Sequence, residues 1–145
     1  MIRVQSMPFD SGGELNTFSS SVAGVGAIVS FTGVVRDVEG GLSNMIIEHY
    51  PGMTEKALEA IRSEAMQRWD LADILIVHRT GLLEAHESIM MVATASKHRK
   101  DAFEAAEFLM DYLKSRAPFW KKEITLDGAD WVASKSEDED ALSRW

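Results

Sequence analysis

A set of basic side chains has the types and the spacing to bind an anion and to move protons on it. Arginine grips a phosphate or carboxylate through two hydrogen bonds, and a lysine crowded by other cations has a lowered pKa. Such a lysine donates or accepts a proton near neutral pH, where histidine also titrates. Composition and spacing therefore predict an anion site, and they leave open whether it is catalytic. The set comprises Arg36, His98, Arg99, Lys114, Lys121 and Lys122.

The segment from Leu109 to Glu123 joins a predicted helix to a predicted strand and reads LMDYLKSRAPFWKKE. It holds four cations, although the chain as a whole is acidic. Each of them alone is explained as well by a solvated surface position, and a cation in the last turn of a helix suits the helix dipole. Their concentration at one corner favours the anion site. They are Lys114, Arg116, Lys121 and Lys122.

A second basic cluster, Lys97 to Lys100, stands at the start of the same predicted helix. Cations oppose the dipole there, at about 0.3–1 kcal/mol per exposed charge. Local conflicts of this kind tend to fall at functional sites, and a bound anion would also use the free N–H groups of the first turn. The cluster therefore indicates a functional site, at which an anion would bind.

Composition excludes several classes of protein. The chain has 145 residues, 46% of them hydrophobic, which predicts one domain over residues 1–145. A net charge of −8 argues against general nucleic-acid or membrane binding. The absence of cysteine excludes disulfides, thiolate nucleophiles and cysteine-bound zinc, so the sulfur of any sulfur chemistry comes from elsewhere. No signal peptide or apolar membrane span is recognised, so a cytoplasmic location is expected.

Other chemistries find little support in the motifs. The four histidines show no HxH or HExxH spacing, so neither a metal nor another cofactor is expected. A nucleophilic serine would need a G-x-S-x-G elbow, which is missing. Hydrolysis by paired carboxylates stays open, because acidic residues are plentiful and no pair stands out.

Apolar runs and turn residues predict the strands. Gly33 interrupts the second strand and suggests a bulge, and Asp127-Gly128 predicts a hairpin turn. The run Ser88–Ser96 is apolar throughout, so it should be covered on both faces. The predicted strands cover residues 2–5, 27–32, 45–50, 73–79, 88–96 and 119–126, with a returning strand at 131–132.

Helical periodicity predicts the elements that separate these strands. A weak helix covers residues 14–22, and a stronger one runs from Thr54, as its N-cap, to Trp69, with Glu55 outside the capping-box position. The helix after Lys100 should bury a face that includes Phe103. The charged tail, residues 135–145, is either mobile or docked through its last apolar side chains, Leu142 and Trp145.

This order of elements contains no dinucleotide-binding fingerprint and no P-loop. It therefore favours an α+β fold over a doubly wound one. We expect a mixed sheet, two main helices and a C-terminal hairpin.

Five segments of the chain resemble the large, catalytic subunit of molybdopterin synthase. The last of them, MDYLK-x-RAPFWK, is highly specific, and together they extend over roughly residues 26–135 in the family's order. The segments are GAIVSFTGVVRD, IEHYPGMTEKAL, VHRTG, SKHRKDAFEA and MDYLKSRAPFWKKE.

The resemblance implies an α/β-hammerhead fold and an activity in molybdenum cofactor biosynthesis. Family members convert a cyclic pyranopterin monophosphate into molybdopterin by building its dithiolene. The sulfur arrives as a thiocarboxylate on the C-terminal glycine of a small ubiquitin-like subunit, whose tail enters the active site. The large subunit forms a homodimer, and one small subunit at each end completes a heterotetramer.

The resemblance also assigns residue roles. Lys114 and Lys121 match the main catalytic positions. Phe31 and Met110 match packing neighbours of the site. Substrate-binding positions, some of them contributed across the dimer, are matched by Arg36, His98, Arg99, Lys122, Glu123, Val34 and Val35. Many members have a basic or polar residue where this chain has Val34, which leaves that position backbone contacts only.

Two other functions compete with this one. A non-catalytic module could capture an anionic ligand or the C-terminal carboxylate of a partner in a basic pocket. A phosphate-ester hydrolase would act without any partner protein. Turnover separates them, because a binder releases its ligand chemically unchanged.

Overall fold

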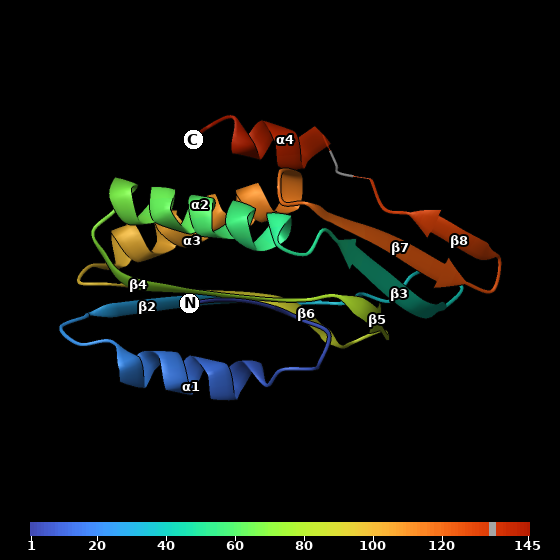
Figure 1. Cartoon of the computed structure of the whole chain (residues 1–145), viewed down its shortest axis with the longest axis horizontal. Coiled ribbons are helices and arrows are strands. Elements are labelled where there is room, and N and C mark those ends of the chain that lie inside the picture. The colour runs from blue at the N-terminus through green and yellow to red at the C-terminus, as the bar shows by residue number, and fades with distance from the viewer. Residues whose placement is uncertain (134–135) are drawn as a thin grey trace.

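Two four-stranded sheets and four helices make up residues 1–133 and 136–145, which the computed structural model describes (Figure 1). The predicted α+β class is confirmed, with two sheets in place of one mixed sheet. The elements are β1 Ile2–Gln5, α1 Ser11–Ser21, β2 Ala27–Val34, β3 Leu42–His49, α2 Met53–Arg68, β4 Leu71–Arg79, β5 Gly81–Leu83, β6 Ser88–Ser96, α3 Arg99–Ser115, β7 Phe119–Thr125, β8 Gly128–Trp131 and α4 Ser136–Leu142.

The first sheet has the strand order β1-β4-β6-β2, with β1 parallel to β4 and the other pairs antiparallel. Helices α2 and α3 cover one face and α1 covers the other (Figure 1). Alternate residues of a strand point to opposite faces, so Ile74 and Ile76 pack toward α2 and α3, and Leu75 and Val77 toward α1. The prediction that Ser88–Ser96 is covered on both faces is confirmed.

The second sheet is antiparallel throughout, with the order β5-β3-β7-β8. The predicted hairpin is confirmed, although its returning strand is Gly128–Trp131 and not residues 131–132. Gly128 adopts a φ of +136° that only glycine reaches readily. Because β7 directly follows α3, this sheet carries the basic segment away from the end of the helix.

The start of α2 differs from the prediction. Its N-cap is Gly52, with φ of +83°, and Glu55 is the third helical residue. The Glu55 carboxylate accepts a hydrogen bond of 2.6 Å from the Gly52 N–H, and the Thr54 hydroxyl donates to the Tyr50 carbonyl. The choice of Thr54 as the N-cap was therefore wrong, because the Pro51-Gly52 turn lets the helix begin two residues earlier.

The buried face of α3 also differs from the prediction. Phe103 was expected on it, but its side chain is 60% exposed. The helix instead buries small side chains around Phe108 and Leu109, and their size lets α3 lie close to the sheet. The buried small residues are Ala102, Ala105 and Ala106.

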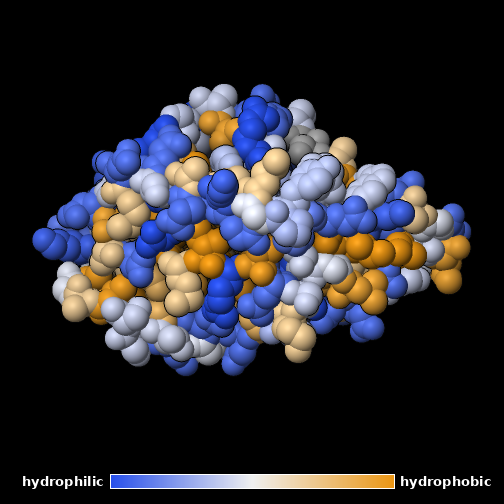
Figure 2. All heavy atoms as spheres, in the orientation of Figure 1, coloured by the Kyte–Doolittle hydropathy of each residue, from blue (hydrophilic) through white to orange (hydrophobic). Residues whose placement is uncertain are grey.

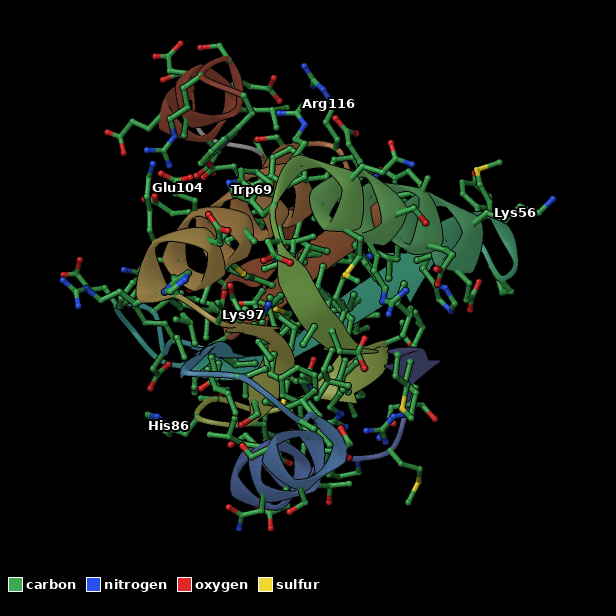
Figure 3. All side chains as sticks on the ribbon, turned by 90° about the vertical axis from the view of Figure 1, so that its left-hand side faces the viewer. Lys56, Trp69, His86, Lys97, Glu104 and Arg116 are labelled. Carbon is green, nitrogen blue, oxygen red and sulfur yellow. The ribbon has the colours of Figure 1, made fainter. Side chains whose placement is uncertain are left out.

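Of the two alternatives for the C-terminal tail, the docked one holds for residues 136–145, while residue 135 lies outside the described residues. Trp145 packs against Trp69 and Phe108, with ring centroids 5.6 Å apart in both cases. Its indole N–H donates to Asp111 at 2.6 Å. In Figure 3, Trp69 lies beside Glu104, which accepts its indole hydrogen bond at 2.9 Å. Within the described residues, no helix is long and apolar enough to cross a membrane.

Candidate functional site

Two pockets meet at the end of α3. The larger has a volume of about 570 Å³ and lies between the last turn of α3, the start of β7 and α4. The smaller, of about 260 Å³, lies between α3, β2 and β6. Four side chains line both pockets, and we call them the junction: His78, Leu113, Lys114 and Lys121.

A tight corner brings the two lysines together. Helix α3 ends at Ser115, and the N–H groups of Arg116 and Ala117 both donate to the Tyr112 carbonyl. Pro118 cannot continue the helix, and β7 begins at Phe119. Lys114 in the last helical turn and Lys121 two residues into the strand therefore approach the junction from different elements.

The junction lowers the pKa of Lys121 to about 8. Burial is the main cause, the Lys114 ammonium is the second, and the Asp138 carboxylate on α4 opposes both. A lysine with this pKa exists in both protonation states near neutral pH, so it can act as an acid or a base. Crowding by a second cation, the cause that the sequence analysis named, therefore contributes to the lowered pKa, but burial is the larger cause.

His78 is a junction residue that the sequence reasoning did not select. Its side chain is 3% exposed at the end of β4, and its Nδ1 lies 2.8 Å from the Arg79 carbonyl oxygen. Its ring stacks on Phe119, with centroids 3.7 Å apart and planes 11° apart. Burial lowers its pKa to about 3, with a further contribution from the Lys121 charge, so the imidazole is neutral. The available signal was a histidine inside an otherwise apolar buried strand.

The smaller pocket contains the residues assigned to packing. Phe31 and Met110 line it, and the β-bulge between Gly33 and Val34 leaves the Val34 side chain 49% exposed beside them. Val35 points into the core instead. Its side chain is fully buried, and its N–H and carbonyl pair with Glu87 and His86.

Lys122 and Glu123 line neither pocket. Successive strand residues face opposite sides, so Lys122 points away from the Lys121 side and places its Nζ over the Trp131 ring, 5.4 Å from the centroid. Glu123 lies opposite Met45 of β3 and Asp130 of β8.

The remaining cations lie apart from the junction. His98 and Arg99 begin α3 and Lys114 lies in its last turn, and a rise of 1.5 Å per residue puts about 22 Å between the two ends. Arg36 follows β2 at the Lys114 end but lines neither pocket. The side chains of Lys97 to Lys100 are exposed and make no ion pair within the described part of the chain.

The described residues contain no group of three or more His, Asp or Glu side chains arranged to hold a metal ion. Two lysines supply positive charge and exchangeable protons, and the pockets on either side give room for two reactants.

Fold and junction together define an α+β protein with two lysines where two pockets meet, and solved structures share this architecture. A molybdopterin biosynthesis MoaE protein from Burkholderia ambifaria superposes with a TM-score of 0.83 and 50% identity, over 100% of this chain and 97% of that one. A molybdopterin synthase from Staphylococcus aureus gives 0.80 and 32%, over 90% and 95%.

Sequence comparison identifies the family. The model of the MoaE protein family matches residues 4–116. The molybdopterin synthase catalytic subunit of Cereibacter sphaeroides is 64% identical over 144 residues, which cover 99% of both chains. The chain therefore belongs to the MoaE family, in agreement with the resemblance seen in its motifs.

Proposed function

We propose that this chain is a catalytic subunit that builds the molybdopterin dithiolene. It moves sulfur from the thiocarboxylated C-terminus of a small ubiquitin-like subunit to cyclic pyranopterin monophosphate. The observation that carries the proposal is the pairing of Lys114 and Lys121 where two pockets meet, in a MoaE-family chain without cysteine. Relatives named as catalytic subunits of molybdopterin synthase support it.

The thiocarboxylate sulfur is the nucleophile in this reaction, so the chain supplies none of its own. Lys114 and Lys121 stabilise the negative charge that develops and move protons as sulfur replaces oxygen. The lowered pKa of Lys121 suits the second task. Arg36, His98 and Arg99 hold the phosphate and orient the pterin.

The small subunit is proposed to insert its tail into the larger pocket. Val132 lines that pocket and is 45% exposed, and Leu126 and Trp131 on the same hairpin are 89% and 55% exposed. Figure 2 shows apolar residues at the surface where β3, β7 and β8 form one end of the molecule. Exposed apolar area of this kind marks protein interaction sites. A single domain over residues 1–145 and a cytoplasmic location complete the proposal.

We propose that a second copy of the chain unites the two groups of cations in one reaction centre. Because α3 is a rigid helix, His98 and Arg99 cannot reach Lys114 of their own chain across about 22 Å. In a two-fold dimer, one copy would give the lysines and the other the α3 N-terminus. Each reaction centre is then shared.

Mixing two inactive variants is expected to restore activity. Lys114→Ala removes one half of each centre, and Arg99→Ala removes the other. Random pairing of equal amounts makes half of the dimers mixed, each with one intact centre of two, so about a quarter of wild-type activity should return. Turnover after co-refolding measures this. A mixture as inactive as its components would show that the centre lies within one chain.

The function itself is tested by turnover. The chain is mixed with a thiocarboxylated small subunit and the cyclic precursor, and the dithiolene-bearing pterin is detected by mass spectrometry. Product that requires both components is the expected result. A stable complex that leaves the partner's tail unchanged would indicate a binding module, and release of phosphate without any partner would indicate a hydrolase.

A further inference from the structure

His78 is held rigidly at the junction. Its Nδ1 can bond the Arg79 carbonyl oxygen only by donating, so Nδ1 carries the proton. Arg79 is itself fixed, because its guanidinium donates to the Ser6 carbonyl and to Glu87. Phe119 covers one face of the His78 ring. The ring therefore has one tautomer and one orientation.

With the proton on Nδ1 and the ring neutral, Nε2 keeps its lone pair. Among the four junction side chains it is the acceptor that is present whatever the charge of Lys121, since a lysine ammonium group only donates and Leu113 is apolar. A protonated histidine would put a third positive charge beside Lys114 and Lys121. Burial, which lowers the His78 pKa to about 3, prevents this.

We propose that His78 binds an N–H or O–H donor of the substrate through Nε2 while the lysines bind its anionic part. The inference rests on the proposed function, since the fused pterin ring of the precursor carries such donors. The junction would thereby bind two features of the substrate: the lysines its negative charge, and His78 the polar edge of its ring. This makes His78 a substrate-binding residue without a change in its protonation state.

Two variants separate this role from packing. His78→Phe keeps the aromatic stack on Phe119 but removes the acceptor. His78→Gln places an amide oxygen near the position of Nε2. We expect His78→Phe to raise the KM for the precursor about tenfold, the effect of losing one hydrogen bond, and His78→Gln to recover part of the loss. Affinity for the small subunit should stay unchanged in both.

His49 supplies the matched control. It lies on β3 against the same Phe119, with centroids 6.3 Å apart, and it lines neither pocket. His49→Phe should leave the KM at the wild-type value. Folding of every variant is checked by circular dichroism and thermal unfolding.

A folded His78→Phe protein with wild-type KM and kcat would overturn the inference. So would a fall in kcat and a shifted pH profile at constant KM, because His78 would then act through Lys121. Either result leaves the proposed function standing, since that is judged by turnover of the wild-type protein.

Discussion

Replacing Lys114 by alanine is expected to lower product formation at least about a hundredfold, the usual effect of removing a group that stabilises charge in the transition state. Lys114 lines both pockets, so its ammonium can reach reactants held in either. It is exposed in the last turn of α3 and makes no ion pair with another described residue, so the fold should tolerate its loss. The rate of dithiolene formation is measured at saturating concentrations of both reactants.

The small subunit should still bind the Lys114→Ala protein, which isothermal calorimetry can test. Lys56→Ala is the matched control, because Lys56 is an exposed lysine on α2, outside both pockets (Figure 3). It should be fully active. Full activity of Lys114→Ala itself would remove Lys114 from the mechanism.

The second prediction with a large effect concerns Lys121, whose replacement should change both activity and fold stability. Lys121→Met should eliminate turnover and at the same time stabilise the fold by about 3 kcal/mol at pH 7, the cost of a shift from 10.5 to about 8. Methionine matches the length of the lysine stem and needs no charge in the half-buried site. A charged group that is kept partly buried for function commonly lowers the stability of the fold.

The direction in which stability changes with pH follows from the pKa values of Lys121 in the folded and unfolded states. Its pKa is about 8 in the folded chain against 10.5 when unfolded, so between these values the unfolded state binds more protons and wild-type stability rises with pH. The cost of the buried charge is fully present below pH 8 and is lost above 10.5. The advantage of Lys121→Met should therefore shrink across this window.

Urea denaturation at pH 7, 9 and 10.5 measures the free energy of unfolding for both proteins. Lys56→Met serves as the control and should change stability little at any of these pH values. If Lys121→Met were less stable than the wild type at pH 7, burial would not be the main cause of the lowered pKa.

Strands were the most predictable part of this fold, because a local pattern defines them. The apolar run Ser88–Ser96 indicated burial on both faces, and Asp127-Gly128 indicated the hairpin. Helix details were harder. The exposure of Phe103 and the N-cap at Gly52 depend on how neighbouring elements meet, and no short window of sequence contains that information.

The grouping of the candidate site was predictable only in part. The two lysines on either side of the proline corner lie together as expected, and crowding contributes to the lowered pKa of Lys121, but burial is the larger cause and was not anticipated. The separation of Arg99 from Lys114 follows from the length of α3 once its ends are known. The sequence did not indicate His78 as a site residue, because its place in the site depends on the two pockets. These form between elements that lie far apart in the chain.

That same separation along α3 has a consequence in genetic terms. In the proposed dimer with shared centres, a chain altered at Lys114 alone would still complete one centre when it pairs with a normal copy, so the allele would be recessive or nearly so. A chain altered at both Lys114 and Arg99 would spoil both centres of every mixed pair. Such an allele would be dominant negative, although the protein it encodes folds and assembles normally.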